Sequence, residues 1–334
     1  MNERGKNILP MIGFILIVIV VLGGFAFFSR KKDTGNFKVI DNTRKKSGFG
    51  YDIDSTGKVS TDGVDKITIR SVSSEVKIAT HKSDQVNAHF YGNVIGFNKE
   101  NMPYLEVEKK GNEALVRIVY PAKTGLNITE NTKLDVVIPE DWNRNIEVIS
   151  ISGGISADQL TGNDITLNTT SGKIEISDID ADGTISASSI SGSCNIDKVI
   201  SDNAKINTSS GDTVVGYLEA KDIKFKTISG HGKLNVTVKK AELNSTSGNI
   251  DVDFTNGFEK ISAKSISGGV KLGIPGTTEF TVDLKTISGG IDCQDFPMKI
   301  SSSGKKELKG QVGSGGSEID VSTTSGNIEI YGLN

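Results

Sequence analysis

Residues 223–252 read IKFKTISGHGKLNVTVKKAELNSTSGNIDV and contain two Ser-Gly pairs, Ser229-Gly230 and Ser247-Gly248. On both sides of each pair, apolar residues alternate with polar ones. Alternation with a period of two is the pattern of a β-strand that buries one face. The stretch therefore predicts short strands joined at Ser-Gly corners, with the same unit repeated immediately along the chain.

The unit recurs through the second half of the chain. Neighbouring copies follow one another at nearly constant steps up to Gly289, and a last copy lies near the C-terminus. Positions seven and five before each glycine are apolar, and position three before it is always Ser or Thr. A nearly fixed, short period is typical of solenoid proteins. The predicted corner glycines are Gly153, Gly172, Gly192, Gly211, Gly230, Gly248, Gly268, Gly289 and Gly326.

Two short strands cannot bury their own apolar face, so the copies must stack. The sequence therefore predicts an all-β fold, a parallel β-solenoid of about 19-residue Ser-Gly coils. Because Ile-Ser-Gly copies alternate with Thr-Ser-Gly or Ser-Ser-Gly copies, a coil of about twice that length, the 38-residue coil, also fits, and we favour the shorter one. We expect each glycine to supply a positive φ or room for close backbone approach. We expect the Ser and Thr hydroxyls to form ladders along the stack.

The regions that flank the repeats suggest a domain order. Residues 146–334 are expected to form the solenoid, with a loop or hairpin between 296 and 316 that interrupts the stack. Residues 59–145 are expected to form an N-terminal β cap with a first degenerate coil, in which Ser74 takes the glycine position. A hairpin is predicted at Lys110-Gly111-Asn112. Such a cap would hide the exposed end of a solenoid.

The N-terminal region predicts a membrane anchor. Residues 1–7 form a short tail, Ile8–Phe28 is an apolar run without a charged residue, and residues 29–58 are expected to be a basic flexible linker. A helix over this run would span roughly 30 Å, the thickness of the hydrocarbon core. A cleaved signal peptide is the alternative, but Phe27 and Phe28 stand where small residues are needed for cleavage. Basic residues lie on both sides of the run, and the positive-inside rule taken literally would place the body in the cytoplasm.

Several motifs together resemble those of a known family: LDVVIPEDW (134–142), EVISISGGI (147–155), TTSGKIEI (169–176), TSGNIDV (246–252) and STTSGNIEIYG (322–332). Over roughly residues 60–334 the chain resembles a bacterial family known as putative adhesins, LiaG-like proteins among them. The resemblance implies an N-terminal membrane anchor, a body outside the cytoplasm at the cell envelope, and a link to envelope-stress systems. It supplies no catalytic residues.

Other chemistry is poorly supported by the sequence. A net charge of −3 gives no bias toward nucleic acid. The three histidines, His81, His89 and His231, are scattered and predict no metal triad. We expect no cofactor, no metal and no enzyme activity. Cys194 and Cys293 fall in apolar columns about five coils, or on the order of 24 Å, apart, which is too far for a disulfide.

The favoured function is a single-pass, membrane-anchored extracytoplasmic scaffold or adhesin-like binding module. Its partners are the membrane, through Ile8–Phe28, and an envelope protein or an anionic wall polymer. The candidate binding surface is a basic stripe of Lys224, Lys226, Lys264 and Lys285. Two alternatives stay open: a polymerising, bactofilin-like scaffold on the cytoplasmic side, and a polysaccharide-active β-helix enzyme.

Overall fold

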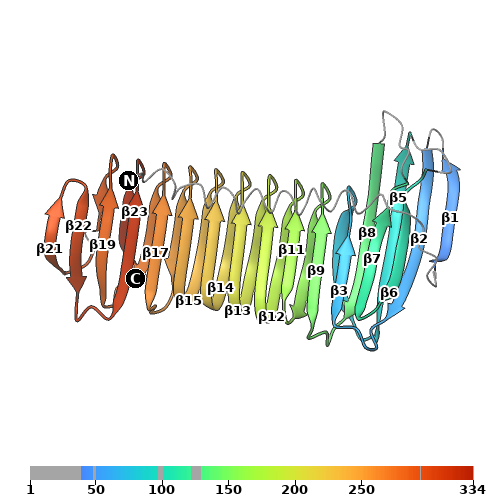
Figure 1. Cartoon of the computed structure of the whole chain (residues 1–334), viewed down its shortest axis with the longest axis horizontal. Helices are drawn as coiled ribbons and strands as arrows, with labels where there is room; N and C mark the ends of the chain where they lie inside the picture. The colour runs from blue at the N-terminus through green and yellow to red at the C-terminus, as the bar shows by residue number, and fades with distance from the viewer. Residues whose placement is uncertain (1–38, 48–49, 97–100, 122–128, 294, 334) are drawn as a thin grey trace, which may run out of the picture.

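This computed structural model describes residues 39–47, 50–96, 101–121, 129–293 and 295–333. All regular structure in these ranges is β-strand, and most neighbouring strands run parallel. Figure 1 shows a long stack of coils, with the N-terminal strands at one end and the β21–β22 hairpin at the other. The all-β fold class predicted from the sequence is confirmed.

The stack has two faces that meet at the Ser-Gly corners. The strands before the corners form the first face: β3 (Lys66–Arg70), β9 (Asn145–Ser150), β11 (Ile165–Thr169), β17 (Lys260–Ser265), β19 (Phe280–Thr286) and β23 (Ser317–Thr323). The strands after the corners form the second: β4 (Glu75–His81), β10 (Ile155–Gly162), β16 (Ile250–Phe254), β18 (Val270–Pro275), β20 (Ile291–Asp292) and β24 (Ile328–Leu333). Four longer strands start on the second face and end on the first: β12 (Ile174–Ser189), β13 (Cys194–Thr208), β14 (Thr213–Thr227) and β15 (Gly232–Ser245).

From Gly153 to Gly268, successive Ser-Gly copies are direct neighbours in the stack. Ile174 pairs in parallel with Ile155 on one side and with Cys194 on the other, and Cys194 pairs with Thr213. One coil therefore holds one copy, which confirms the shorter of the two predicted coil lengths. The two apolar columns before each corner are buried along the whole stack, from Ile146 to Val321.

The corner glycines are required by close approach of neighbouring backbones. A Cβ on Gly211 would lie 1.9 Å from the carbonyl oxygen of Gly192, and the other eight corners show the same contact with the adjacent corner at 1.8–2.0 Å. None of the nine corner glycines has a positive φ, so glycine is needed at the corners for close backbone approach and not for its backbone conformation. Ser74 is tolerated because its side chain faces Thr132, 2.7 Å away, instead of another corner glycine.

The buried hydroxyls act mainly within their own coil. Thr169 Oγ1 accepts a hydrogen bond from the Gly172 amide at 2.9 Å, and Thr323 Oγ1 donates to the Gly326 carbonyl at 2.6 Å. Such bonds close several of the corners, whereas the hydroxyls of Ser150, Ser189 and Ser265 have no hydrogen-bond partner among the described residues. The predicted hydroxyl ladder is seen as a direct contact between Thr208 and Thr227, 3.3 Å apart. The ladder is therefore wrong as the general rule, because the corner's own backbone groups are nearer.

The N-terminal block caps one end of the stack. Its strands are β1 (Val39–Ser47), β2 (Gly50–Ser60), β5 (Gln85–Ile95), β6 (Tyr104–Lys110), β7 (Glu113–Val119) and β8 (Thr129–Pro139). The predicted hairpin at Gly111 is confirmed: β6 and β7 pair antiparallel, and Gly111 has a φ of 63°.

The expected flexible linker is wrong where it overlaps this block. Residues 39–47 and 50–60 form β1 and β2, and β2 pairs with β5 along its whole length. Ile53, Ser55 and Val59 face inward and are buried. A Cβ on Gly57 would lie 2.6 Å from Val107 Cγ2, so small residues are needed here for packing. The Gly and Ser residues of this segment therefore fit a closely packed interior, and their abundance does not indicate a flexible linker.

The last coil of the chain does not lie at the end of the stack. β23 pairs with both β17 and β19, and β24 pairs with both β18 and β20, so residues 317–333 are inserted between two earlier coils. The hairpin of β21 (Met298–Gly304) and β22 (Glu307–Val312), at the predicted interruption, pairs antiparallel with β19 and covers that end. The first coil is enclosed in the same way, with β3 between β7 and β9 and β4 between β8 and β10.

Within the described ranges no helix has the length and apolar character of a membrane span. The predicted span Ile8–Phe28 lies outside those ranges.

We predict that Gly211→Ala lowers the free energy of unfolding by about 3 kcal/mol, because the added Cβ overpacks the corner. Gly257→Ala is the matched control, since a Cβ there meets nothing within 4 Å. Thermal and denaturant unfolding of the full chain, followed by circular dichroism, measures both. Equal stability of the two variants would show that the corner contact is not a constraint.

We also predict that Cys194 and Cys293 form no disulfide within one chain. The register runs from Cys194 through Thr213, Gly232, Ile250, Val270, Ile328 and Ile291, which is six coil steps and about 29 Å, one step more than the sequence suggested. Cys293 is only partly buried, contrary to its expected core position. Burial raises the pKa of the Cys194 thiol to about 12, so we expect Cys194 to resist alkylation until the protein unfolds. An intrachain disulfide found by mass spectrometry of the native monomer would contradict this register.

Candidate binding surfaces

The predicted lysine stripe lies on the first face of the stack, but it is interrupted. Lys226, Lys264 and Lys285 share one outward column, four positions before their corners. Asn244 lies between the first two, and Ser322 of the inserted last coil lies between the second and third. The predicted basic stripe is therefore interrupted twice. Asn244 separates Lys226 from Lys264 already in the order of the repeats, and Ser322 separates Lys264 from Lys285 because the strand that follows Lys264 in space is not the next one in the chain.

Lys224 lies in the neighbouring column, six positions before its corner. Its Nζ is 3.2 Å from Glu242 Oε2 on the next coil. Burial would raise the pKa of Glu242, but the hydrogen bond and positive charge of Lys224 outweigh it, and the pKa lies below its ordinary value. Lys224 is thus half of an ion pair and not a free cation.

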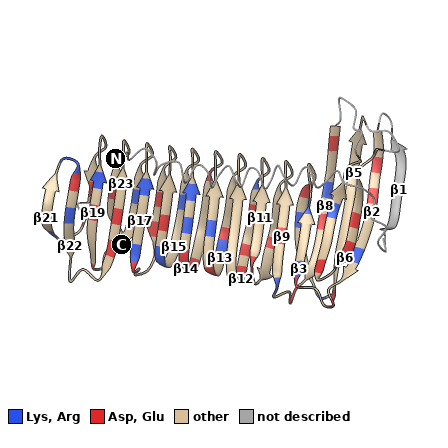
Figure 2. Cartoon of the chain, viewed as in Figure 1, with Lys and Arg blue, Asp and Glu red and all other residues tan. Residues whose placement is uncertain are grey.

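The column of Lys224 also carries acidic residues toward the C-terminal end. Asp283 contacts Lys285 at 3.0 Å and Lys309 at 3.1 Å, and Lys260 contacts both Glu318 and Asp320. Figure 2 shows the resulting mixture of blue and red bands across the stack. Ion pairs between neighbouring lysines and carboxylates recur across the outer face. Lys226 and Lys264, in contrast, form no ion pair with another described residue.

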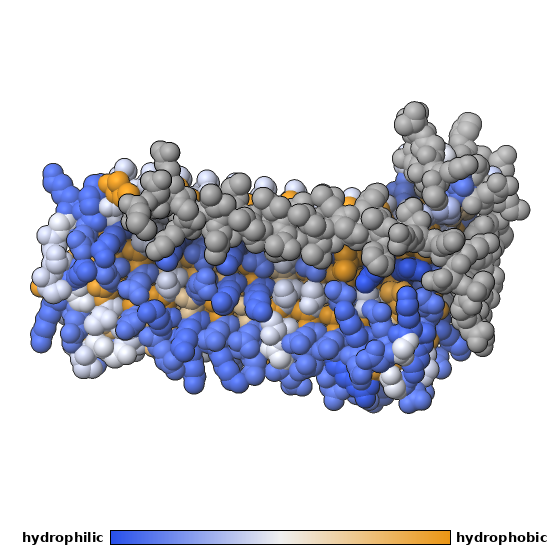
Figure 3. Space-filling view, in the orientation of Figure 1, coloured by the Kyte–Doolittle hydropathy of each residue, from blue (hydrophilic) through white to orange (hydrophobic). Residues whose placement is uncertain are grey.

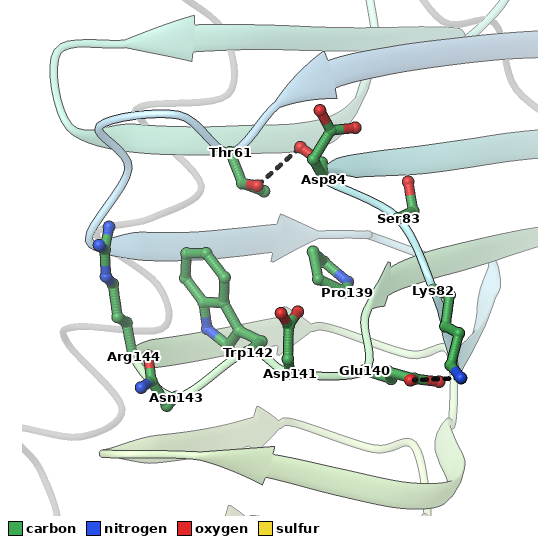
Figure 4. Close-up of a pocket in the computed structure, with 10 residues that line it drawn as sticks. All are labelled: Thr61, Lys82, Ser83, Asp84, Pro139, Glu140, Asp141, Trp142, Asn143 and Arg144. Carbon is green, nitrogen blue, oxygen red and sulfur yellow. Dashed lines mark hydrogen bonds and ion pairs between the residues drawn. The ribbon is translucent and has the colours of Figure 1, made fainter.

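A pocket of about 590 Å³ lies beside the N-terminal block, in the connections β2–β3, β4–β5 and β8–β9. Figure 4 shows the side chains that line it. They are Thr61, Lys82, Ser83, Asp84, Pro139, Glu140, Asp141, Trp142, Asn143 and Arg144. Part of this lining is the LDVVIPEDW motif, which the sequence marked as a family feature but not as a site.

The pocket is polar and mixed in charge. Lys82 Nζ lies 3.9 Å from Glu140 Oε1, and Thr61 Oγ1 donates to the Asp84 carbonyl at 2.7 Å. Trp142 is only 6% exposed, so its ring forms a wall and not an open stacking platform. The Arg144 guanidinium lies 6.0 Å from the centre of that ring and donates to the Val64 carbonyl. These contacts give Arg144 and Trp142 structural roles in shaping the pocket.

An exposed polar cluster on the N-terminal block was missed by sequence reasoning. His89 Nε2 lies 2.7 Å from Asp54 Oδ1, and its ring stacks on Tyr91 with centroids 4.5 Å apart. Tyr91 Oη donates to Asp135 at 3.1 Å. The cluster exists because β5 pairs antiparallel with both β2 and β8, a non-local arrangement that the sequence period does not report.

The other histidines and the acidic residues do not assemble a reactive centre in the described ranges. There, no group of three or more His, Cys, Asp and Glu side chains is placed to hold a metal ion. The nine corner glycines form a single structural column and contribute no side chain. The structure therefore offers surfaces and a polar pocket as candidate sites.

A comparison with protein-family models matches residues 64–331 to the model described as Toastrack DUF4097. The match covers the first coil, strands β5–β8 of the cap and nearly all of the stack. Among curated proteins, none matches the chain.

Solved structures with a similar arrangement share little sequence with this chain. A putative adhesin from Parabacteroides distasonis ATCC 8503 is 12% identical, with a TM-score of 0.48, 83% of this chain covered and 96% of that one. A putative adhesin from Parabacteroides merdae ATCC 43184 is 11% identical, with a TM-score of 0.45, 83% and 95% covered. A putative lipid binding protein from Parabacteroides distasonis ATCC 8503 is 16% identical, with a TM-score of 0.42, 83% and 96% covered.

We predict that Arg144→Ala opens the pocket wall. Loss of the guanidinium above Trp142 and of its bond to Val64 should destabilise the protein by about 1–2 kcal/mol. It should also shift the emission of Trp142, the single tryptophan of the chain, to longer wavelength. Lys82→Ala, at the opposite side of the pocket, should leave the emission unchanged. An unchanged spectrum for Arg144→Ala would contradict the structural role of Arg144.

Proposed function

The chain belongs to the Toastrack DUF4097 family, and we propose that it is a membrane-anchored binding module of the bacterial cell envelope. In this proposal Ile8–Phe28 crosses the membrane once, and a β-solenoid body outside the cytoplasm presents its surface to an envelope protein or an anionic wall polymer. The resemblance to LiaG-like proteins extends the proposal to a link with envelope-stress systems.

The observation that carries the proposal is the uncharged run Ile8–Phe28 that precedes the body. Its length matches the hydrocarbon core of a bilayer. The body that follows is a stack in which the columns seven and five positions before each corner are buried and apolar, while its outward positions change from coil to coil. Extended repeat surfaces of this kind bind partners through many modest contacts.

A non-enzymatic role is part of the proposal. The Ser-Gly pairs that recur in every coil have a structural task, since each corner glycine contacts the next corner. Carboxylates on the outer face are held by lysines, as Asp178 is by Lys198 at 3.6 Å and Glu242 is by Lys224. These ion pairs support a binding surface more than a pair of catalytic carboxylates.

The ends of the stack argue against the alternative of a bactofilin-like polymer. At one end the antiparallel strand β6 covers β7, and at the other the β21–β22 hairpin covers β19. End-to-end assembly through parallel coils would require these strands to move. Covered edges are a known means of blocking such growth.

Topology can be tested with a thiol placed on the turn between β16 and β17. In a Cys293→Ser background, Asn256→Cys creates one exposed thiol, while Cys194 stays buried. We expect a membrane-impermeant maleimide to label this variant on intact, wall-stripped cells. The same variant after lysis gives the full signal, and a cytoplasmic marker reports leakage. Labelling that appears only after lysis would place the body in the cytoplasm and refute the proposal.

A further inference from the structure

The residues two positions before the corner glycines form an ordered row along the edge where the two faces meet. We call this row the corner ridge. Each corner serine amide donates to the ridge carbonyl of the preceding coil at 2.6–2.9 Å, which sets the order in space. In that order the ridge is Ile151, Thr170, Ile190, Ser209, Ile228, Thr246, Ile266, Thr324 and Ile287. Isoleucine and a hydroxyl residue therefore alternate without a break.

The inserted last coil maintains this alternation. In the chain, the ridge residue after Ile266 is Ile287, but in the stack Thr324 lies between them. The isoleucines are consequently two coils, or about 10 Å, apart along the ridge. The isoleucines are evenly spaced only because the coil that carries Thr324 is inserted between the coils of Ile266 and Ile287. The even spacing therefore belongs to the folded surface and is not a by-product of the repeat order in the chain.

Toward the C-terminal end, the ridge isoleucines are strongly exposed. Ile228 is 36% exposed, Ile266 is 51% exposed and Ile287 is 71% exposed. They are three of the six large hydrophobic side chains with this degree of exposure in the described ranges. Figure 3 shows a hydrophobic patch at this edge of the stack, above β19. A row of large exposed apolar side chains along one edge is a candidate interaction surface.

Each of these isoleucines is accompanied by a lysine two positions earlier, on the same outward face. The pairs are Lys226 with Ile228, Lys264 with Ile266, and Lys285 with Ile287. Figure 2 shows the blue bands near the corner ends of β17 and β19. The five neighbouring corners, 226–231, 244–249, 264–269, 322–327 and 285–290, contain no Asp or Glu. Lys226 and Lys264 have no ion-pair partner among the described residues, whereas Lys285 contacts Asp283, which lies farther from the edge. The ridge itself is therefore basic and apolar.

We infer that this part of the corner ridge docks on an anionic lipid surface. The three isoleucines enter the boundary between headgroups and acyl chains, and Lys226 and Lys264, which form no ion pair with another described residue, contact lipid phosphates. Apolar side chains flanked by lysines are the composition of interfacial membrane-binding surfaces, and cationic side chains near an anionic leaflet are attracted to it. The intervening Thr residues meet the polar headgroup layer.

Spacing and charge favour lipid over a second copy of this chain. Isoleucines about 10 Å apart, separated by hydroxyl residues, do not form the continuous apolar core of a protein interface. Two ridges facing each other would also bring their lysines together. A fluid lipid surface accommodates separate side chains and supplies the negative charge.

The length of the chain before β1 agrees with this inference, a step that rests on the proposed anchor. Only residues 29–38 separate Phe28 from Val39 in the sequence. A chain of that length spans at most about 36 Å. The N-terminal block would therefore be held close to the bilayer in which Ile8–Phe28 would lie, and the ridge, toward the other end of the stack, would be tethered to the same surface (Figure 1).

The test uses the full chain in phosphatidylcholine vesicles with or without phosphatidylglycerol. In a Cys293→Ser background, a fluorophore is attached through Ser267→Cys on the exposed corner beside Ile266, or through Asn256→Cys on the opposite edge as a control. Bromine atoms on the lipid chains near the headgroups quench a fluorophore that reaches them. We expect severalfold stronger quenching at position 267 than at 256, only in the anionic vesicles.

Two sets of substitutions separate the contributions. Ile228, Ile266 and Ile287 are replaced together by Thr, the residue that Thr246 and Thr324 already provide at this position, so the fold is retained. Lys226 and Lys264 are replaced together by Gln. Each set should lower the quenching at position 267 about tenfold, while Val214→Thr, an exposed apolar residue off the ridge, should leave it unchanged.

Three outcomes would overturn the inference. These are equal quenching at both edges, quenching that does not depend on phosphatidylglycerol, and protection of position 267 that grows with protein concentration in the absence of lipid. The last would identify a second copy as the occupant. Flotation with the zwitterionic vesicles reports the anchor separately, so a failure of the anchor is distinguished from a failure of the ridge.

Discussion

The contact between neighbouring corner glycines is the constraint on which the rest of the structure depends. Each Cα approaches the carbonyl of the adjacent corner so closely that no side chain fits between them. This contact keeps the corners in line. Once they are in line, the strands on both sides pair in register, and the apolar columns before and after the corner fall on top of one another. At several corners a buried hydroxyl then bonds the carbonyl of its own corner glycine, as Thr227 and Thr323 do.

Because the repeat is local, most of the stack could be predicted from the sequence. The apolar columns, the corner glycines and the coil length all follow from residues within one period of each other. The hairpin at Gly111 follows from a turn signal of the same short range. What the sequence could not show is which coils become neighbours when the chain leaves the regular order. The residues around Ser317 do not predict that β23 pairs with β17 as well as β19, because this pairing depends on strands that are far away along the chain.

The errors about the candidate site have the same origin. A stripe made of Lys226, Lys264 and Lys285 assumed that consecutive repeats are consecutive coils, and the inserted strand separates two of them. The pocket around Trp142 is formed by three connections that meet only after β4, β5 and β8 have paired. The linker was misjudged for a different reason, because Gly57 and Ser55 are small to fit a crowded interior and not to leave the chain free.

The enclosure of both chain ends has a consequence for how such a protein can change its length during evolution. The first and last coils are each locked between strands that come from elsewhere in the chain, so duplication at either end would disturb a closed arrangement. A coil can be duplicated without disturbing either enclosed end only in the part of the stack that follows chain order, between β9 and β17. There, a single added coil would place two isoleucines or two hydroxyl residues side by side on the edge. Lineages that keep the alternation must therefore gain or lose coils two at a time.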